Sequence, residues 1–320
     1  MIRKLGLLCC LLLVGKILFA QELRRFSFSS PHMGTNFRIV LYAEDSLQAD
    51  TAARAAFSRI EELNEILSDY LPDSELNLLS ARAGSGDFVP VSDELWTVLL
   101  ASRFFSKKSK GAFDISIGPL SRLWRRAMRK AAFPEADKLK KAHALVDWRS
   151  IKLNKKSQSV KLKKEGMKLD LGGIAKGYAV DEAYQVLKDA GIEAALVDGG
   201  GDLLLGNSPP GKEGWTIEVP AYTYPEKEDK DLLVLKNCSV ATSGDTYRYI
   251  ELNGIRYSHI IDPRTALGIS KRRMLTVIAK EGMTADALAS VYSILGKEDE
   301  KKIRKRYRDS SIQVRVIEWP

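Results

Sequence analysis

Cysteine is scarce in this chain, and its scarcity excludes two kinds of site. The 320 residues contain three cysteines, and two of them, Cys9 and Cys10, lie in the apolar run that begins the chain. Removal of that run would leave Cys238 as the only thiol. A single cysteine forms no disulfide within the chain and cannot build a cysteine-based metal centre. Cys238 lies in the apolar segment LLVLKNCSVAT, which predicts a buried strand residue.

Long hydrophobic runs are also rare, and the one that stands out begins the chain. Arg3 and Lys4 precede an apolar run over residues 5–19, and Ala20 is a candidate cleavage site. This order of basic, apolar and small residues is typical of a secretory signal. We expect residues 1–20 to be a signal peptide or N-terminal anchor and residues 21–320 to form one domain. The protein is then expected to be exported, either periplasmic or on the extracytoplasmic side of the inner membrane, with membrane association through a retained N-terminus.

Aromatic residues make up only 8% of the chain, whereas basic residues are abundant. Lys and Arg outnumber Asp and Glu by 50 to 41, which gives a net charge of +9. Nucleic-acid-binding modules combine basic residues with stacking aromatic side chains on one face. The basic runs, such as residues 122–130, show no such interleaving and are typical of a solvated surface. We therefore expect no nucleic-acid partner.

The chain has no GxGxxG after its first predicted strand, which argues against a doubly wound dinucleotide-binding sheet. Hydrophobic periodicity places the strands in clusters, a pattern that favours an α+β fold. Helices are predicted at residues 49–67, 93–105 after a Ser92 cap, 175–190, and 285–295 before Gly296. Strands are predicted at residues 35–43, 89–91, 194–197, 216–219, 232–242, 256–261, 274–279 and 312–317, with strands and turns over 148–169.

The most informative segment is LDLGGIAKGYAVDEA, residues 169–183. A strand-like run ends at Asp170, two glycines form a turn, and a helix begins near Ala175. Helix starts leave N–H groups unpaired and carry partial positive charge, so they attract anions. Lys176 adds a positive charge in the first helical turn. The pattern favours a phosphate site, and the alternative is a routine strand-to-helix connection with a solvated lysine.

A second candidate site is the predicted helix start MTADALAS, residues 283–290, with Thr284 as the expected N-cap. Asp286 and Ser290 are four residues apart, so their oxygens lie on one helical face. A carboxylate, a hydroxyl and a nearby backbone carbonyl form a sparse oxygen-only set that suits Mg²⁺. The alternative is an acidic residue that only stabilises the start of its own helix.

A third candidate is His259, one of three histidines, in a predicted strand that leads into a turn at Pro263. Histidine can act as a general base near neutral pH. Asp262 is the candidate group to orient it. The alternative is a packed structural histidine.

Three further segments carry polar or small residues that could face a ligand. GAFDISIGPL is predicted to be a strand bracketed by Gly111 and Gly118. Its Asp114 could accept hydrogen bonds from a purine or flavin edge, or could cap a turn. Met33-Gly34-Thr35 begins the first predicted strand, and Ser68-Asp69-Tyr70 follows the first predicted helix.

Taken together, these segments resemble the ApbE-like proteins, which are FAD:protein FMN transferases. Eight segments occur in the family's order, from about residue 31 to about residue 296: MGTNFRIVLY, SDYLPDSELNLLS, GAFDISIGPL, LDLGGIAKGYAVDEA, VDGGGDLLLGN, ATSGDTYRYI, YSHIIDPRT and MTADALAS. The resemblance implies an α+β, T-fold-like architecture of two related halves with mixed and antiparallel sheets and FAD in a cleft between them. It also implies Mg²⁺ at the FAD pyrophosphate and transfer of FMN to an acceptor threonine, with release of AMP.

The resemblance assigns roles to residues by their positions. Contacts with the flavin nucleotide are implied for Met33, Tyr70, Ala112, Phe113 and Asp114. The resemblance also places Lys176 at a phosphate and His259 beside the reacting phosphorus, and it implies that Ile260 contacts the cofactor. The implied metal ligands are Gly173, Asp286 and Ser290. His259 and Asp286 are the expected catalytic residues. The family usually has threonine where this chain has Ser290, and the hydroxyl is retained.

Two alternatives to transfer remain open from the sequence. If water replaces the threonine, the same site is a metal-dependent FAD pyrophosphatase that yields FMN and AMP. If neither nucleophile reacts, the chain is an exported protein that binds FAD without turnover. The acceptor that the resemblance implies is an exported or membrane-bound electron-transfer subunit with a threonine-containing flavinylation motif.

Overall fold

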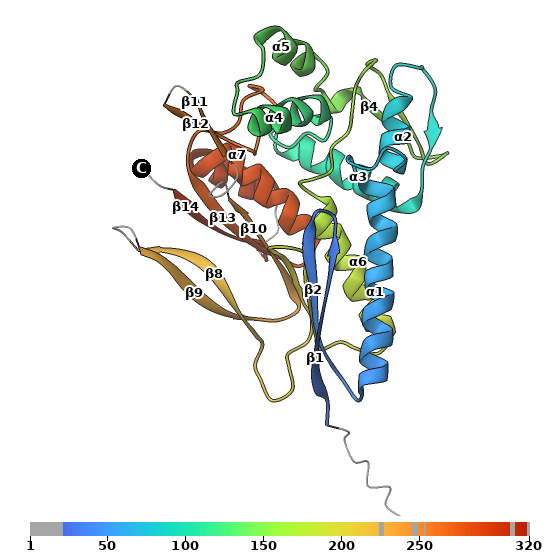
Figure 1. Ribbon diagram of the computed structural model, residues 1–320, viewed down its shortest axis with the longest axis vertical. Coiled ribbons are helices and arrows are strands. Elements are labelled where there is room, and N and C mark those ends of the chain that lie inside the picture. The colour runs from blue at the N-terminus through green and yellow to red at the C-terminus, as the bar shows by residue number, and fades with distance from the viewer. Residues whose placement is uncertain (1–21, 224–226, 245–248, 253, 308–310, 319–320) are drawn as a thin grey trace, which may run out of the picture.

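The computed structural model describes residues 22–318, except 224–226, 245–248, 253 and 308–310 (Figure 1). The predicted signal peptide or anchor therefore lies outside the described residues. Of the helices in the described part of the chain, none combines the length and apolar character needed to cross a bilayer.

A seven-stranded sheet forms the centre of the molecule, and each pair of neighbouring strands in it is antiparallel. Its strands in sheet order are β1 (Arg24–His32), β2 (Thr35–Ala43), β6 (Ala195–Asp198), β7 (Asp202–Leu205), β10 (Cys238–Gly244), β13 (Arg273–Ala279) and β14 (Gln313–Glu318). Strands from both ends of the chain thus lie in one sheet, and the α+β expectation is confirmed.

Three long helices cover one face of this sheet: α1 (Ser46–Leu67), α6 (Ala175–Asp189) and α7 (Gly282–Tyr307) (Figure 1). Strand β2 shows why this face is apolar, because side chains alternate along a strand. Phe37, Ile39 and Leu41 are fully buried against the helices. Val40, between them, belongs to a separate apolar cluster on the other face.

A two-stranded hairpin of β8 (Trp215–Thr223) and β9 (Lys227–Leu235) covers part of that other face (Figure 1). Trp215 and Ile217 of β8 pack there with Val40 and Val240. The sheet is therefore buried on both faces, with helices on one side and this hairpin on the other.

Shorter elements complete the fold around the end of the helical layer. They are α2 (Glu75–Ala81), α3 (Asp93–Lys108), α4 (Gly118–Lys130), α5 (Ala136–Ala144), β3 (Val89–Pro90), β4 (Ile151–Asn154), β5 (Ser159–Leu162), β11 (Tyr249–Leu252) and β12 (Ile255–Ser258). An apolar cluster that includes Leu120, Trp124 and Ile261 joins α4 to the segment after β12.

The segment predicted as a strand between Gly111 and Gly118 is instead a turn followed by α4, so that prediction is wrong. Asp114 Oδ1 accepts hydrogen bonds from the Ser116 N–H at 2.9 Å and the Ser116 hydroxyl at 2.6 Å. This side-chain turn closes the backbone on itself and competes with strand pairing. Pro119 then lies in the first turn of α4, where its missing N–H costs nothing.

Two other predicted strands differ from the observed ones, since one is divided in two and the other ends early. The run at residues 232–242 is divided between β9 and β10, with Asn237 between them at a φ of 50°. β9 pairs only with β8, whereas β10 lies in the main sheet. The strand predicted at residues 256–261 ends at Ser258, so His259 lies in a bend beyond β12.

Helix α7 is longer than predicted at both ends. It begins at Gly282, before Thr284, and it continues through Gly296 to Tyr307. Thr284 is therefore not the N-cap. Asp181 of α6 accepts hydrogen bonds from the N–H groups of Gly282 at 2.6 Å and Met283 at 2.9 Å. A carboxylate on one helix thus satisfies the first N–H groups of the other.

Candidate active site

A cleft of about 880 Å³ lies where α1, α4, α6, α7 and the end of β10 meet. Its size falls in the usual range for ligand pockets, roughly 300–1,000 Å³. All eleven residues predicted for the site line this one cleft, namely Met33, Tyr70, Ala112, Phe113, Asp114, Gly173, Lys176, His259, Ile260, Asp286 and Ser290. The structure brings them together from segments up to 257 residues apart in the chain, whereas their individual roles stay predictions.

Lys176 lies in the first turn of α6, as the sequence predicts. Its ammonium group forms an ion pair with Asp202 at the start of β7. Asp202 is buried, and burial raises the pKa of its carboxyl while the charge of Lys176 opposes that rise. Asp202 was not predicted as a site residue, although it ends the run DGGGD.

Asp286 lies on the first turns of α7 and is only 6% exposed. Its Oδ2 accepts a hydrogen bond from the Gly177 N–H at 3.0 Å. Burial raises the pKa of this carboxyl to about 7, the negative charge of Asp202 adds to the rise, and Lys176 opposes it. Two buried carboxylates thus share one lysine, and a further cation would relieve their repulsion.

Ser290 lies one turn beyond Asp286 on α7, against the glycine turn before α6. A Cβ added to Gly173 would lie 2.6 Å from Ser290 Oγ, so a larger residue there would displace the Ser290 hydroxyl. The Ser290 hydroxyl makes no hydrogen bond within the described part of the chain. Gly173, Asp286 and Ser290 all line the cleft, and a backbone carbonyl, a carboxylate and a hydroxyl are ligand types that suit Mg²⁺, which keeps several waters. That these three residues hold the ion stays a prediction. In the described ranges no group of three His, Cys, Asp or Glu side chains forms a self-contained metal site.

The β1–β2 hairpin brings Met33 to the cleft. Its two-residue turn consists of Met33 and Gly34, with φ values of 48° and 74°. Two positive φ angles are the signature of a type I′ hairpin turn, in which methionine is unusual. This turn projects the Met33 side chain into the lining of the cleft.

Asp114 is buried and already holds several donors. Besides the two Ser116 contacts, its Oδ2 accepts a hydrogen bond from the Trp148 N–H at 2.9 Å. Burial raises the pKa of this carboxyl, and the bonds from Ser116 and Trp148 oppose the rise. Asp114 therefore shapes the turn that places Ala112 and Phe113 in the cleft. This agrees with the predicted alternative in which Asp114 caps a turn.

His259 and Ile260 line the cleft just beyond β12. Asp262, the predicted partner of His259, accepts hydrogen bonds from Arg264 Nε at 2.9 Å and Arg264 Nη2 at 2.7 Å. That Asp262 orients His259 stays a prediction.

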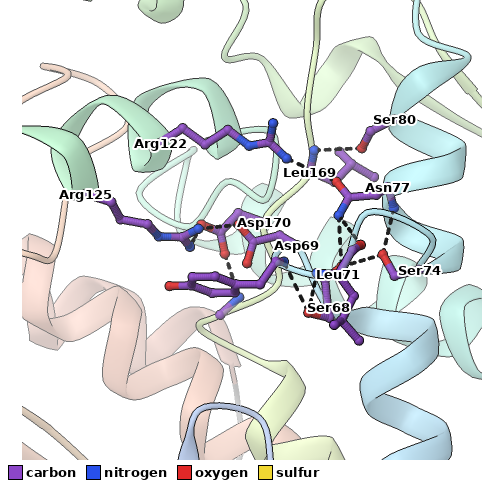
Figure 2. A network of polar contacts seen from close by, with 12 residues as sticks. Ser68, Asp69, Leu71, Ser74, Asn77, Ser80, Arg122, Arg125, Leu169 and Asp170 are labelled. Carbon is purple, nitrogen blue, oxygen red and sulfur yellow. Dashed lines mark hydrogen bonds and ion pairs between the residues drawn. The ribbon is translucent and has the colours of Figure 1, made fainter.

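Figure 2 shows a polar network that joins the loop after α1, helix α4 and the segment before α6. Arg125 of α4 donates from Nη1 to Asp69 at 2.5 Å and from Nη2 to Asp170 at 2.9 Å. The same guanidinium lies over the ring of Tyr70, 4.2 Å from its centroid. Arg125 stands in a basic run, RLWRRAMRK, that resembles a solvated helix face, so its sequence position does not mark it as a site residue.

Comparison with known proteins gives consistent matches over nearly the whole chain. The model of the ApbE family matches residues 33–315. The FAD:protein FMN transferase of Treponema pallidum (strain Nichols) is 32% identical over 311 residues, which cover 92% of this chain and 86% of that protein. The protein of the same description from Vibrio cholerae is 31% identical over 84% of this chain and 81% of its own length.

Solved structures of the same family superpose closely on this chain. The flavin transferase ApbE from Vibrio cholerae superposes with a TM-score of 0.83 at 28% identity and covers 92% of this chain and 94% of its own. The ApbE protein from Thermotoga maritima superposes with a TM-score of 0.80 at 28% identity, with the same two coverages.

Proposed function

Because this chain belongs to the ApbE family, we propose that it is an FAD:protein FMN transferase that uses Mg²⁺, modifies a threonine hydroxyl of an acceptor protein and releases AMP. The observation that carries this proposal is the contact between two helix starts, the Gly177 N–H of α6 and the Asp286 carboxylate of α7. It places a lysine, an N-terminal helix dipole and buried carboxylates around one point of the cleft, as a diphosphate with a divalent cation requires.

The residues that would hold Mg²⁺ are Gly173, through its carbonyl, together with Asp286 and Ser290. The ion would supply Lewis-acid stabilisation of negative charge on the pyrophosphate, worth several kcal/mol. The other groups act through the chain itself. Lys176 and the N–H groups at the start of α6 would hold the phosphates and fix their orientation.

The proposed transfer is a single displacement at phosphorus. The threonine oxygen bonds to the phosphorus of the FMN half, and the bond from that phosphorus to the bridging oxygen of AMP breaks. The proton of the threonine hydroxyl passes to His259, which lies in the cleft wall. Proton transfer by a positioned base contributes on the order of 10²-fold or more to such a rate.

One incubation tests the proposal against its alternatives. The full chain is mixed with FAD, Mg²⁺ and an acceptor that carries a threonine-containing flavinylation sequence. Flavin fluorescence that stays on the denatured acceptor supports transfer. AMP without a labelled acceptor indicates pyrophosphatase activity, and neither product indicates a protein that only binds FAD, so either result overturns the proposal. An acceptor with its threonine changed to alanine is the matched control.

We also propose that the acceptor is an exported or membrane-bound electron-transfer subunit, because the chain begins with a signal-like segment. The protein would then act in the periplasm or on the outer side of the inner membrane. Fractionation of cells that express the full chain tests this, with and without residues 1–20. Recovery of the full chain from the cytoplasm alone would contradict it.

A further inference from the structure

We propose that Arg125 is a positioning residue that holds the ring of Tyr70 in place for the isoalloxazine of FAD. This inference rests on the proposed function, since it assumes that the cleft binds FAD. Arg125 itself need not touch the reacting atoms. It would act by limiting the orientations of Tyr70 before the substrate arrives.

The Tyr70 side chain is largely exposed, so packing alone limits its orientation little. The residue is 73% exposed, on the loop between α1 and α2. Ser68 Oγ fixes the backbone of this loop by accepting hydrogen bonds from the Tyr70 N–H at 3.1 Å and the Leu71 N–H at 3.2 Å. The ring itself is stacked under the Arg125 guanidinium, whose central carbon lies 4.2 Å from the ring centroid. A cation over an aromatic face attracts it and leaves the opposite face available.

The guanidinium is fixed more firmly than a surface arginine. Both of its carboxylate partners are nearly buried, with the side chain of Asp69 8% exposed and that of Asp170 9% exposed. Burial and the charge of Asp170 raise the pKa of the Asp69 carboxyl, and Arg125 opposes that rise. The two carboxylates therefore need the guanidinium between them. Its planar fork, held by two separate acceptors, sets the plane on which Tyr70 stacks.

Asp170 also connects the Arg125–Tyr70 contact to the proposed phosphate side of the cleft. Its second oxygen, Oδ1, accepts a hydrogen bond from the Gly172 N–H at 2.8 Å, in the turn that leads to Gly173. That bond does not involve Arg125, so the turn keeps its own support when Arg125 is replaced. Loss of Arg125 should therefore weaken contacts with the flavin ring and spare contacts with the diphosphate.

The test compares two ligands in the presence of Mg²⁺, FAD and ADP, of which ADP lacks the flavin. Their dissociation constants are measured by calorimetry for the wild type, Arg125→Met and Arg125→Lys. Arg126→Met is the matched control, since Arg126 is the exposed neighbour on the same helix. Arg125→Lys keeps a charge between the two carboxylates but has no planar face, so it remains informative if Arg125→Met folds poorly.

We expect Arg125→Met to weaken FAD binding several-fold to about tenfold and to leave ADP binding within twofold. Arg125→Lys should show the same selective loss, and Arg126→Met should show none. Arg125→Met should also reduce the change in the flavin's visible absorption on binding. Added to Tyr70→Ala, it should cost little further FAD affinity, because the two residues act through one contact.

Equal losses for FAD and ADP, or FAD binding by Arg125→Met as in the wild type, would overturn this inference. So would full additivity of Arg125→Met with Tyr70→Ala. Failure of the proposed function looks different, since the wild type would then bind FAD without labelling the acceptor. A wild type that binds no FAD would overturn both.

Discussion

The Gly177 N–H donates to Asp286 Oδ2 across 3.0 Å, and this bond joins the first turn of α6 to the second turn of α7. The two helices touch backbone to backbone here. A Cβ added to Gly177 would lie 2.2 Å from the Gly282 carbonyl oxygen and 2.8 Å from Asp286 Cβ. Asp181, one turn further along α6, holds the Gly282 and Met283 N–H groups. The position of Asp286 in the cleft therefore depends on how closely α6 and α7 approach.

Gly177→Ala should separate the two helices, because a backbone oxygen cannot move aside as a flexible side chain can. We expect a loss of about 1–3 kcal/mol in the free energy of unfolding, the usual cost of overpacking. Denaturant unfolding measures it, and Gly244→Ala is the matched control. A Cβ on Gly244 would meet the Met274 side chain at an ordinary 3.4 Å. Equal stability of the two variants would contradict a close contact between the helix starts.

Asp286→Asn should remove the stabilisation that Mg²⁺ gives to the wild type. A ligand at one hundred times its dissociation constant stabilises the folded state by about 2.7 kcal/mol. An amide lacks the charge that a divalent cation requires, so the shift in Tm with Mg²⁺ should vanish. Glu281→Gln is the control, because Glu281 is an exposed acid just before α7. An unchanged Mg²⁺ shift in Asp286→Asn would exclude the proposed metal site.

The raised pKa of Asp181 predicts how the free energy of unfolding depends on pH. Burial raises the pKa of its carboxyl to about 7, Glu281 and Glu182 add to the rise, and the two N–H groups of α7 oppose it. Between the unfolded value near 3.8 and about 7, the folded state therefore binds the proton more tightly. Stability from this group falls as pH rises through that window, by at most about 1.4 kcal/mol per pH unit.

Asp181→Asn should flatten this pH dependence relative to the wild type, since the amide does not titrate there. Urea unfolding at several pH values between 4.5 and 7.5 measures the slope. Asp189→Asn, on the exposed end of the same helix, should leave the wild-type slope unchanged. A wild-type slope that persists in Asp181→Asn would assign the effect to other carboxyls.

The sequence predicted the parts of the fold that local patterns determine. The helix of α6 with Lys176 in its first turn follows from a glycine turn and an apolar stripe, and Ser92 caps α3 as expected. Strand β1 was missed because it is mostly exposed, and its signal lay in the Phe26 and Phe28 alternation before the Met33-Gly34 turn. The segment at residues 232–242 was predicted as one strand, but Lys236 and Asn237 separate β9 from β10, and Asn237 has a positive φ.

The eleven residues predicted for the site share one cleft, but Asp202 and Arg125, which also line it, were missed, and so were the ion pairs. Segment motifs located all the predicted lining residues, because each motif marks a turn or a helix start. Which carboxylate meets Lys176, and which arginine meets Asp69 and Asp170, depends on contacts across 26 to 56 residues of chain. No local pattern encodes such pairs.

His259→Ala should slow transfer by on the order of 10²-fold or more while FAD affinity stays close to the wild-type value. The reason is that a base acts on the threonine proton and not on bound FAD. Single-turnover labelling of the acceptor at saturating FAD measures the rate, and calorimetry measures FAD binding. His143→Gln serves as control, because His143 lies outside the cleft lining and contacts the Pro263 carbonyl at 3.0 Å. If His259→Ala labels the acceptor at a near-normal rate, the threonine proton leaves by another route. If it loses FAD affinity and rate together, His259 binds the nucleotide, and the base must be sought among the other groups of the cleft.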